Sequence, residues 1–219
     1  MRHTSITMVL ATGIVMAAMM LAAGNSRMHL PDNQQGYAPE QPIAFSHQLH
    51  AGEMAISCRY CHYAAEQGRH AGIPSAGVCL NCHRFVPATF GAIRAEDELA
   101  KEEGREIRPV VSDEIRKIYD SLALDVENKL APKEGSSPKP IEWVRVHNLP
   151  SFVYFDHRAH VVAGVKCQHC HGPVKTMQRI RQVESLGMGW CVNCHRDANE
   201  HGVQGAKVHA STDCDACHH

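Results

Sequence analysis

Five copies of the pattern Cys-x-x-Cys-His contain every cysteine of this 219-residue sequence. The motif cysteines are Cys58, Cys61, Cys79, Cys82, Cys167, Cys170, Cys191, Cys194, Cys214 and Cys217. The histidines that end the motifs are His62, His83, His171, His195 and His218. Two cysteines at this spacing can each add to one vinyl group of a porphyrin, and the next histidine then lies under the iron. The pattern predicts five covalent c-type haems with these histidines as proximal ligands.

Other uses of a Cys-x-x-Cys pair suit this chain less well. A structural zinc ion takes four ligands, so such pairs are normally used two at a time, and five pairs would leave one over. A redox dithiol or a disulfide framework has no need of a histidine after every second cysteine. The motifs also account for all 10 cysteines, which leaves none for another role.

A second pattern, Phe-x-His-x-x-His, begins at Phe45 and again at Phe155, and two haem motifs follow each copy. This is an internal repeat of a two-haem unit, with a fifth haem appended. Histidines three apart on a helical turn point to similar sides but not to one point, so they are better placed to ligate two neighbouring irons. The predicted distal ligands of four irons are His47, His50, His157 and His160.

His147 completes the predicted set of distal ligands for five irons. Met188 and Met177 flank the fourth motif and are the alternatives, although most methionines fill apolar gaps. A thioether ligand would raise the potential of that haem. A sixth haem held only by spare histidines is a further alternative, which we do not favour. The spare histidines are His70, His169, His201, His209 and His219.

An apolar run from about Ile6 to Gly24 follows Arg2 and His3 at the N-terminus. It just reaches the length that spans a bilayer, so we expect a signal anchor or transmembrane helix over residues 1–24; a cleaved signal peptide is the alternative. Arg2 would stay inside and the rest would be exported. The remaining expected parts are a tether (25–42), a first two-haem unit (43–90), a helical insertion and linker (91–140), and a second two-haem unit with the fifth haem (141–219).

The composition favours a mostly α-helical and irregular fold with little β-structure. Only 5% of the residues are aromatic, so the side chains make a thin core and the porphyrins must serve as much of it. Within the insertion we expect an exposed, charged helix at Ala95–Gly104 and a second helix capped by Ser112. The apolar face of the second helix is expected to consist of Ile115, Ile118, Leu122 and Val126. The net charge of -1 and the lack of a basic run give no indication of nucleic acid as a partner.

The order of these motifs resembles the membrane-anchored multihaem cytochrome c subunit of alternative complex III, and equally the related subunit of the quinone reductase complex of sulfate reducers. The resemblance covers about residues 43–90 and 141–196, and includes Ile73-Pro74-Ser75, the stretch from Trp143 to His160, and Met188–Arg196. It implies a haem-packed fold like that of cytochromes c3 and c7. Its implied location is the bacterial cytoplasmic membrane, with the haem domain in the periplasm.

The resemblance also implies partners: a polytopic quinone-binding membrane subunit, large periplasmic subunits related to molybdopterin enzymes and carrying Fe–S clusters, and a soluble periplasmic cytochrome c. Bis-histidine irons have no open position for a substrate, so we expect an electron relay to or from menaquinone with no catalytic site of its own. The alternatives are a free-standing periplasmic carrier of the cytochrome c3 class and a multihaem reductase. The latter is often marked by a motif that ends in Lys, and all five motifs here end in His.

Overall fold

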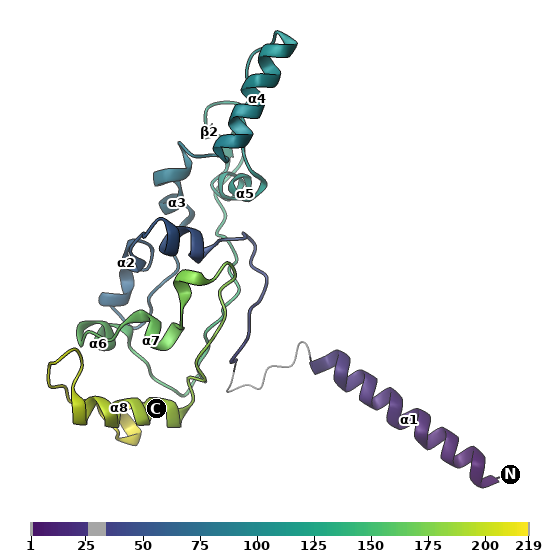
Figure 1. Ribbon diagram of the computed structural model, residues 1–219, viewed down its shortest axis with the longest axis vertical. Coiled ribbons are helices and arrows are strands. Elements are labelled where there is room, and N and C mark those ends of the chain that lie inside the picture. Colours follow the sequence, from purple (N-terminus) through teal and green to yellow (C-terminus); the bar gives the residue numbers. More distant parts are fainter. Residues whose placement is uncertain (1, 26–33, 219) are drawn as a thin grey trace.

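Short helices joined by irregular chain make up most of the protein in the computed structural model, which describes residues 2–25 and 34–218 (Figure 1). The helices are α1 (Arg2–Asn25), η1 (Gln48–Glu53), α2 (Cys58–Cys61), η2 (Tyr63–Glu66), α3 (Ala76–His83), α4 (Phe90–Glu103), α5 (Asp113–Ser121), α6 (His157–Val162), α7 (Cys167–His171), η3 (Val174–Thr176), α8 (Met188–His201) and η4 (Cys214–Ala216). Two antiparallel strands, β1 (Leu124–Asp125) and β2 (Ala131–Pro132), form a small sheet in which Leu124 lies opposite Pro132. The prediction of a mostly helical, irregular fold with little strand is confirmed.

Each Cys-x-x-Cys-His motif lies at or near the start of a helix, and the residue before that helix is extended. Ser57 and Lys166 have ψ of 137° and 138° before α2 and α7, and Ser75 and Gly187 have ψ of 154° and 161° before α3 and α8. Isolated helices shorter than about 12 residues are marginal in water, so helices of this length need support from tertiary contacts. Local helix formation alone therefore does not explain why the motifs adopt a defined conformation.

Figure 1 shows how the elements follow one another in space along the longest axis of the molecule. Helix α4 lies at one end, followed by α5, α3, α2, then α6 with α7, and finally α8 near the C-terminus. Helix α1 lies apart from this column. Among the residues that the structure describes, no helix combines the length and the apolar character that crossing a membrane requires. Part of the expected tether, residues 26–33, lies outside the described residues.

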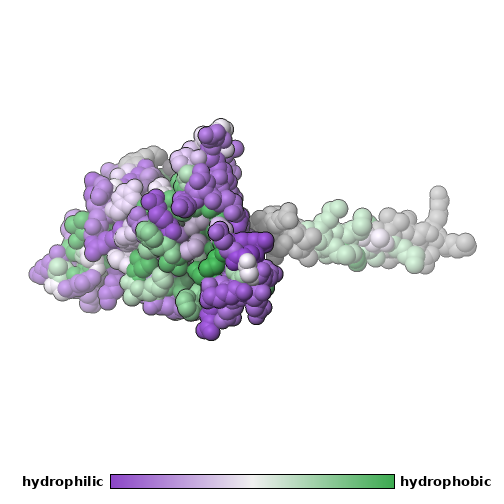
Figure 2. Space-filling view, turned by 90° about the horizontal axis from the view of Figure 1, so that it is seen from above, coloured by the Kyte–Doolittle hydropathy of each residue, from purple (hydrophilic) through white to green (hydrophobic). Residues whose placement is uncertain are grey.

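Few side chains of the described residues are buried, in agreement with the thin core that the composition predicts. The buried apolar residues are Ile43, Ala65, Ala100, Ile118, Tyr119, Ala123, Val146 and Met177. Large apolar side chains elsewhere stay in contact with solvent: Phe85 is 78% exposed, Phe90 79% and Val162 75%. Figure 2 shows apolar patches spread among polar side chains over the face seen from above.

The insertion between the two repeats is tied to the second motif through one buried side chain. Tyr119 of α5 is 1% exposed, and its hydroxyl donates a hydrogen bond of 2.5 Å to the carbonyl of His83. The chain leading into α5 is held as well, because the Ser112 amide donates to the Pro87 carbonyl at 3.0 Å. Ser112 occupies the predicted N-cap position, although its hydroxyl makes no capping bond. The insertion therefore braces the motif that precedes it.

Replacing Tyr119 tests this brace. We expect Tyr119→Phe to lower the free energy of unfolding by about 1 kcal/mol, because the partly buried His83 carbonyl loses its donor while the ring stays packed. Tyr119→Ala should cost about 3–5 kcal/mol, since it also opens a cavity. Chemical denaturation followed by circular dichroism measures both losses. Equal stabilities of Tyr119→Phe and the unmodified protein would show that the hydrogen bond contributes nothing.

Candidate functional site

The histidines predicted as distal ligands of the first repeat face the histidines of the first two motifs. The ring centroids of His47 and His62 lie 6.5 Å apart, with only 6° between the ring planes. The rings of His50 and His83 have centroids 6.1 Å apart and an interplanar angle of 59°. The first histidine of the Phe-x-His-x-x-His pattern thus faces the first motif, and the second faces the second motif.

The second repeat reproduces this arrangement. His157 faces His171 with centroids 6.2 Å apart and ring planes 5° apart, and His160 faces His195 at 6.0 Å and 35°. Both repeats therefore pair their histidines in the same order, which sequence analysis could not assign.

The spacing of these four pairs fits an iron ion between the rings. A bond from a metal to an imidazole nitrogen is about 2 Å long, and the ring centre lies a further ~1.1 Å behind that nitrogen, so two imidazoles on one iron have centroids about 6.2 Å apart. Carbon atoms in direct contact are separated by about 3.5–4.0 Å, so rings 6.0–6.5 Å apart are not stacked on each other. The donor set and its spacing fit bis-histidine haem ligation.

Backbone carbonyls fix the orientation of six of these eight rings through Nδ1. An Nδ1–H that donates to a carbonyl leaves the lone pair on Nε2, the atom that must point at a metal. The bonds join His50 to Ser46 (2.9 Å), His62 to Gly72 (2.7 Å), His83 to Val86 (2.9 Å), His157 to Arg69 (2.8 Å), His160 to Asp156 (2.8 Å) and His195 to Ser211 (2.5 Å).

The other two rings differ. Nδ1 of His47 is buried and has no partner among the described residues. Nδ1 of His171 lies 3.2 Å from Nε2 of His147, and the two rings meet edge to face with centroids 4.4 Å apart. The residue predicted as the fifth distal ligand therefore packs against the proximal histidine of the third motif.

Burial keeps the central imidazoles neutral. It lowers the pKa of His47 to about 4 and that of His147 to about 4. The pKa of His171 falls to about 3, mainly through burial and then through the neighbouring His147. A neutral imidazole is the form that ligates a metal, because the protonated ring has no lone pair to offer. At pH 7 these rings are therefore in the state that ligation requires.

The fifth motif lacks a facing imidazole in the described part of the chain. The ring that packs on His218 is that of Phe152, with centroids 5.7 Å apart and 26° between the planes. The backbone beside it is fixed, since the Tyr154 amide donates to the Cys217 carbonyl at 2.8 Å. The structure thus holds the fifth motif in place without bringing a predicted distal ligand to it.

The methionine alternatives lie in different surroundings. Met177 is buried, and its carbonyl accepts a hydrogen bond of 2.9 Å from the Gln48 amide at the start of η1. Met188 begins α8 and is 71% exposed. Met177 therefore serves the packing of η1 in this structure.

Among the spare histidines, His169 packs near Trp190, with its Nε2 3.5 Å from Sγ of Cys194. His201 lies 3.0 Å from a carboxylate oxygen of Asp197. His70 and His209 are exposed, and His219 lies outside the described residues.

A phenylalanine supports each pair of distal histidines, a role that sequence analysis missed. Phe45 meets His47 edge to face at 4.9 Å and stacks on His50 at 4.4 Å. Phe155 meets His157 at 4.9 Å and packs on His160 at 4.6 Å. The fixed position of the phenylalanine in both copies of the pattern was the available signal.

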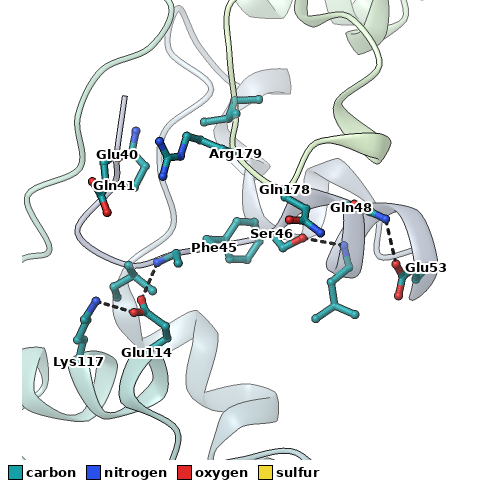
Figure 3. A pocket seen from close by; sticks show the side chains of 14 residues that line it. Glu40, Gln41, Phe45, Ser46, Gln48, Glu53, Glu114, Lys117, Gln178 and Arg179 are labelled. Atoms are coloured by element: carbon teal, nitrogen blue, oxygen red, sulfur yellow. Dashed lines mark hydrogen bonds and ion pairs between the residues drawn. The ribbon is translucent and has the colours of Figure 1, made fainter. Parts of the chain in front are cut away.

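A cavity of about 530 Å³ lies beside Phe45 and is lined by residues of η1, α5 and the 178–180 segment (Figure 3). At its edge the Ala44 amide donates to Glu114 at 2.6 Å, and Lys117 pairs with the same carboxylate. These two interactions hold the residue before Phe45 against α5. The insertion therefore positions the distal histidines of the first repeat as well as the second motif.

Close packing of the two repeats depends on Gly52. A Cβ at this position would overlap the carbonyl of Lys175, which belongs to η3 of the second repeat. The Gln48 amide makes its bond to Met177 across the same contact. A residue without a side chain is therefore required where η1 lies on η3.

Comparisons with known proteins point to multihaem c-type cytochromes, in agreement with the paired imidazoles. Residues 153–219 match the family model described as cytochrome c7 and related cytochrome c. Over 199 residues the chain is also 25% identical to the multiheme cytochrome c subunit of a menaquinone reductase from Nitratidesulfovibrio vulgaris. That alignment covers 82% of this chain and 77% of its relative. The expected resemblance to a quinone reductase subunit is supported along most of the sequence, and the resemblance to alternative complex III stays a prediction.

Proposed function

We propose that this chain is a pentahaem c-type cytochrome that relays electrons as a subunit of a membrane-bound quinone or quinol oxidoreductase complex. The observation that carries the proposal is the set of four imidazole pairs with ring centroids 6.0–6.5 Å apart, each joining a Phe-x-His-x-x-His histidine to a motif histidine. A bound haem supplies an iron that changes its oxidation state by one electron.

The residues of this chain would hold the haems and set their properties. The two cysteines of each motif form thioether bonds, and none of the 10 cysteines is joined to another in a disulfide. At the four paired sites, two imidazoles per iron leave no position for a substrate, which favours electron transfer over bond chemistry. The carbonyls at Nδ1 orient the ligands and increase their basicity, so they help to set the potentials.

Similarity to a menaquinone reductase subunit supports a place in a quinone-linked complex. The partners that we propose are a polytopic quinone-binding membrane subunit, large molybdopterin-enzyme-like and Fe–S periplasmic subunits, and a soluble periplasmic cytochrome c. We also propose that α1 anchors the haem domain on the periplasmic face of the cytoplasmic membrane. Its described side chains support this, since Met8, Ile14 and Met20 are 70–75% exposed.

The haem content and ligand set can be tested together. We expect the purified protein to carry five haems by pyridine haemochrome assay and intact mass. Replacing any one of His47, His50, His157 or His160 with Ala should turn one of the four paired irons high-spin while all five haems stay attached, because the thioether bonds remain. Electron paramagnetic resonance (EPR) spectroscopy counts the high-spin iron.

His70→Ala is the matched control, because His70 is exposed and belongs to neither pattern. It should leave the spin states of the irons as they are in the unmodified protein. Spectra identical to that of the unmodified protein for all four test variants would contradict the proposed ligand set.

His147→Ala separates two roles for this residue. An iron on Nε2 of His171 would leave the proton on Nδ1, and His147 would then accept a hydrogen bond from it. Loss of His147 should therefore shift one haem potential on the order of tens of millivolts without producing a new high-spin iron. His147→Gln offers a side-chain oxygen as acceptor and should restore much of the potential. Spectroelectrochemical titration measures the shift. A new high-spin iron would instead identify His147 as the distal ligand of the fifth haem, as sequence analysis predicted.

Membrane extraction tests the proposed complex. The haem-staining band should leave the membrane only with mild detergent and migrate far above the 24.2 kDa of this chain, together with a polytopic subunit and a large Fe–S subunit. A wash of the membranes at high ionic strength, which breaks salt-sensitive contacts, serves as the control. It should release little of the haem-staining protein. Release without detergent at the mass of the chain alone would favour a free-standing periplasmic carrier.

A further inference from the structure

We infer that the five motifs form one line in the order second, first, third, fourth, fifth, which differs from their order in the sequence. The second and fifth motifs are then the two ends at which electrons enter and leave. This inference rests on the proposed function, since it treats each motif as a haem site. It follows from the contacts that join each motif to the next.

The second motif adjoins the first. Asn81, between the two cysteines of the second motif, donates a hydrogen bond of 2.8 Å to the hydroxyl of Tyr60 in the first motif. Helices α2 and α3 therefore lie side by side.

The first motif also adjoins the third, and this contact joins the two repeats. The loop after the first motif binds the start of α6, because the Arg158 amide donates to the Gly68 carbonyl at 3.2 Å and the His157 ring donates to the Arg69 carbonyl at 2.8 Å. Burial, followed by the nearby thiol of Cys58, raises the pKa of Cys167. A distal ligand of the second repeat is thus oriented by the backbone of the first.

The last two junctions follow the sequence. His169 of the third motif lies 3.5 Å from Cys194 of the fourth. Asn199, at the end of α8, exchanges two hydrogen bonds with Ala210, and the His195 ring donates to Ser211 just before the fifth motif. The chain therefore runs directly from the third motif through the fourth to the fifth.

This order places the two repeats head to head. The first motif of one repeat meets the first motif of the other, and the second motif of each points outward. Figure 1 shows the same succession along the long axis, where α3, α2, α7 and α8 follow one another. Electrons that pass between partners at the two ends would then cross all five sites.

The order can be tested by making one iron high-spin at a time and observing which low-spin signals relax faster through magnetic coupling to it. His47→Ala changes the iron of the first motif, and His50→Ala changes that of the second. In the inferred order His47→Ala should affect two low-spin signals and His50→Ala only one. The reverse result, with one signal for His47→Ala and two for His50→Ala, would indicate sequence order and overturn the inference.

A cross-link tests the junction of the repeats without using haem signals. In the double variant Gly68→Cys/Arg158→Cys the new thiols replace residues joined by a backbone hydrogen bond, so we expect a disulfide between them in the oxidised protein. The pair Arg84→Cys/Arg158→Cys, which starts from the second motif, should not form one. A disulfide in the second pair and none in the first would overturn the order. Failure of the proposed function would be distinct, because the protein would then lack haem absorption altogether.

Discussion

The spacing between facing imidazoles is the constraint on which the rest of this structure depends. Four pairs of rings lie 6.0–6.5 Å apart, too far for direct packing and close to what one shared metal needs. Helices of four or five residues, such as α2 and α7, cannot be stable alone. Few buried side chains support these helices, so we expect them to depend on the haems that the paired histidines would ligate.

Two recurring interactions position the imidazoles: hydrogen bonds at Nδ1 and the packing of a phenylalanine ring. Backbone carbonyls accept from Nδ1, and Phe45 or Phe155 packs on both histidines of a pair. Several of these carbonyls, such as those of Gly72 and Arg69, belong to loops. Their positions do not follow from the geometry of a helix. The irregular chain is therefore functional, since it sets the direction of Nε2. This explains how a protein with so little regular structure can hold many ligands in defined orientations.

The local patterns of the sequence named the histidines that the structure places in facing pairs, but they did not indicate the long-range contacts around them; haem ligation by these residues stays a prediction. The Cys-x-x-Cys-His and Phe-x-His-x-x-His spacings identified all eight rings of the four pairs, because these residues are close in the chain and repeat. The insertion helices were also expected, although α4 begins earlier, at Phe90, and α5 ends at Ser121. The position of His147 against His171 and the bond from Tyr119 to His83 join distant segments, and no periodicity reports such contacts.

The partnership of His171 and His147 distinguishes the junction of the repeats from the other sites. Every other ring with an Nδ1 partner in the four pairs uses a backbone carbonyl, whose position follows the chain. At His171 the acceptor is a side chain that can be exchanged by a single substitution without moving the backbone. The third motif also lies next to the first, where the two repeats meet. A change in the reduction potential of the haem at the third motif would alter electron transfer between the two repeats. The side chain at position 147 could therefore adjust transfer along the whole line of haems.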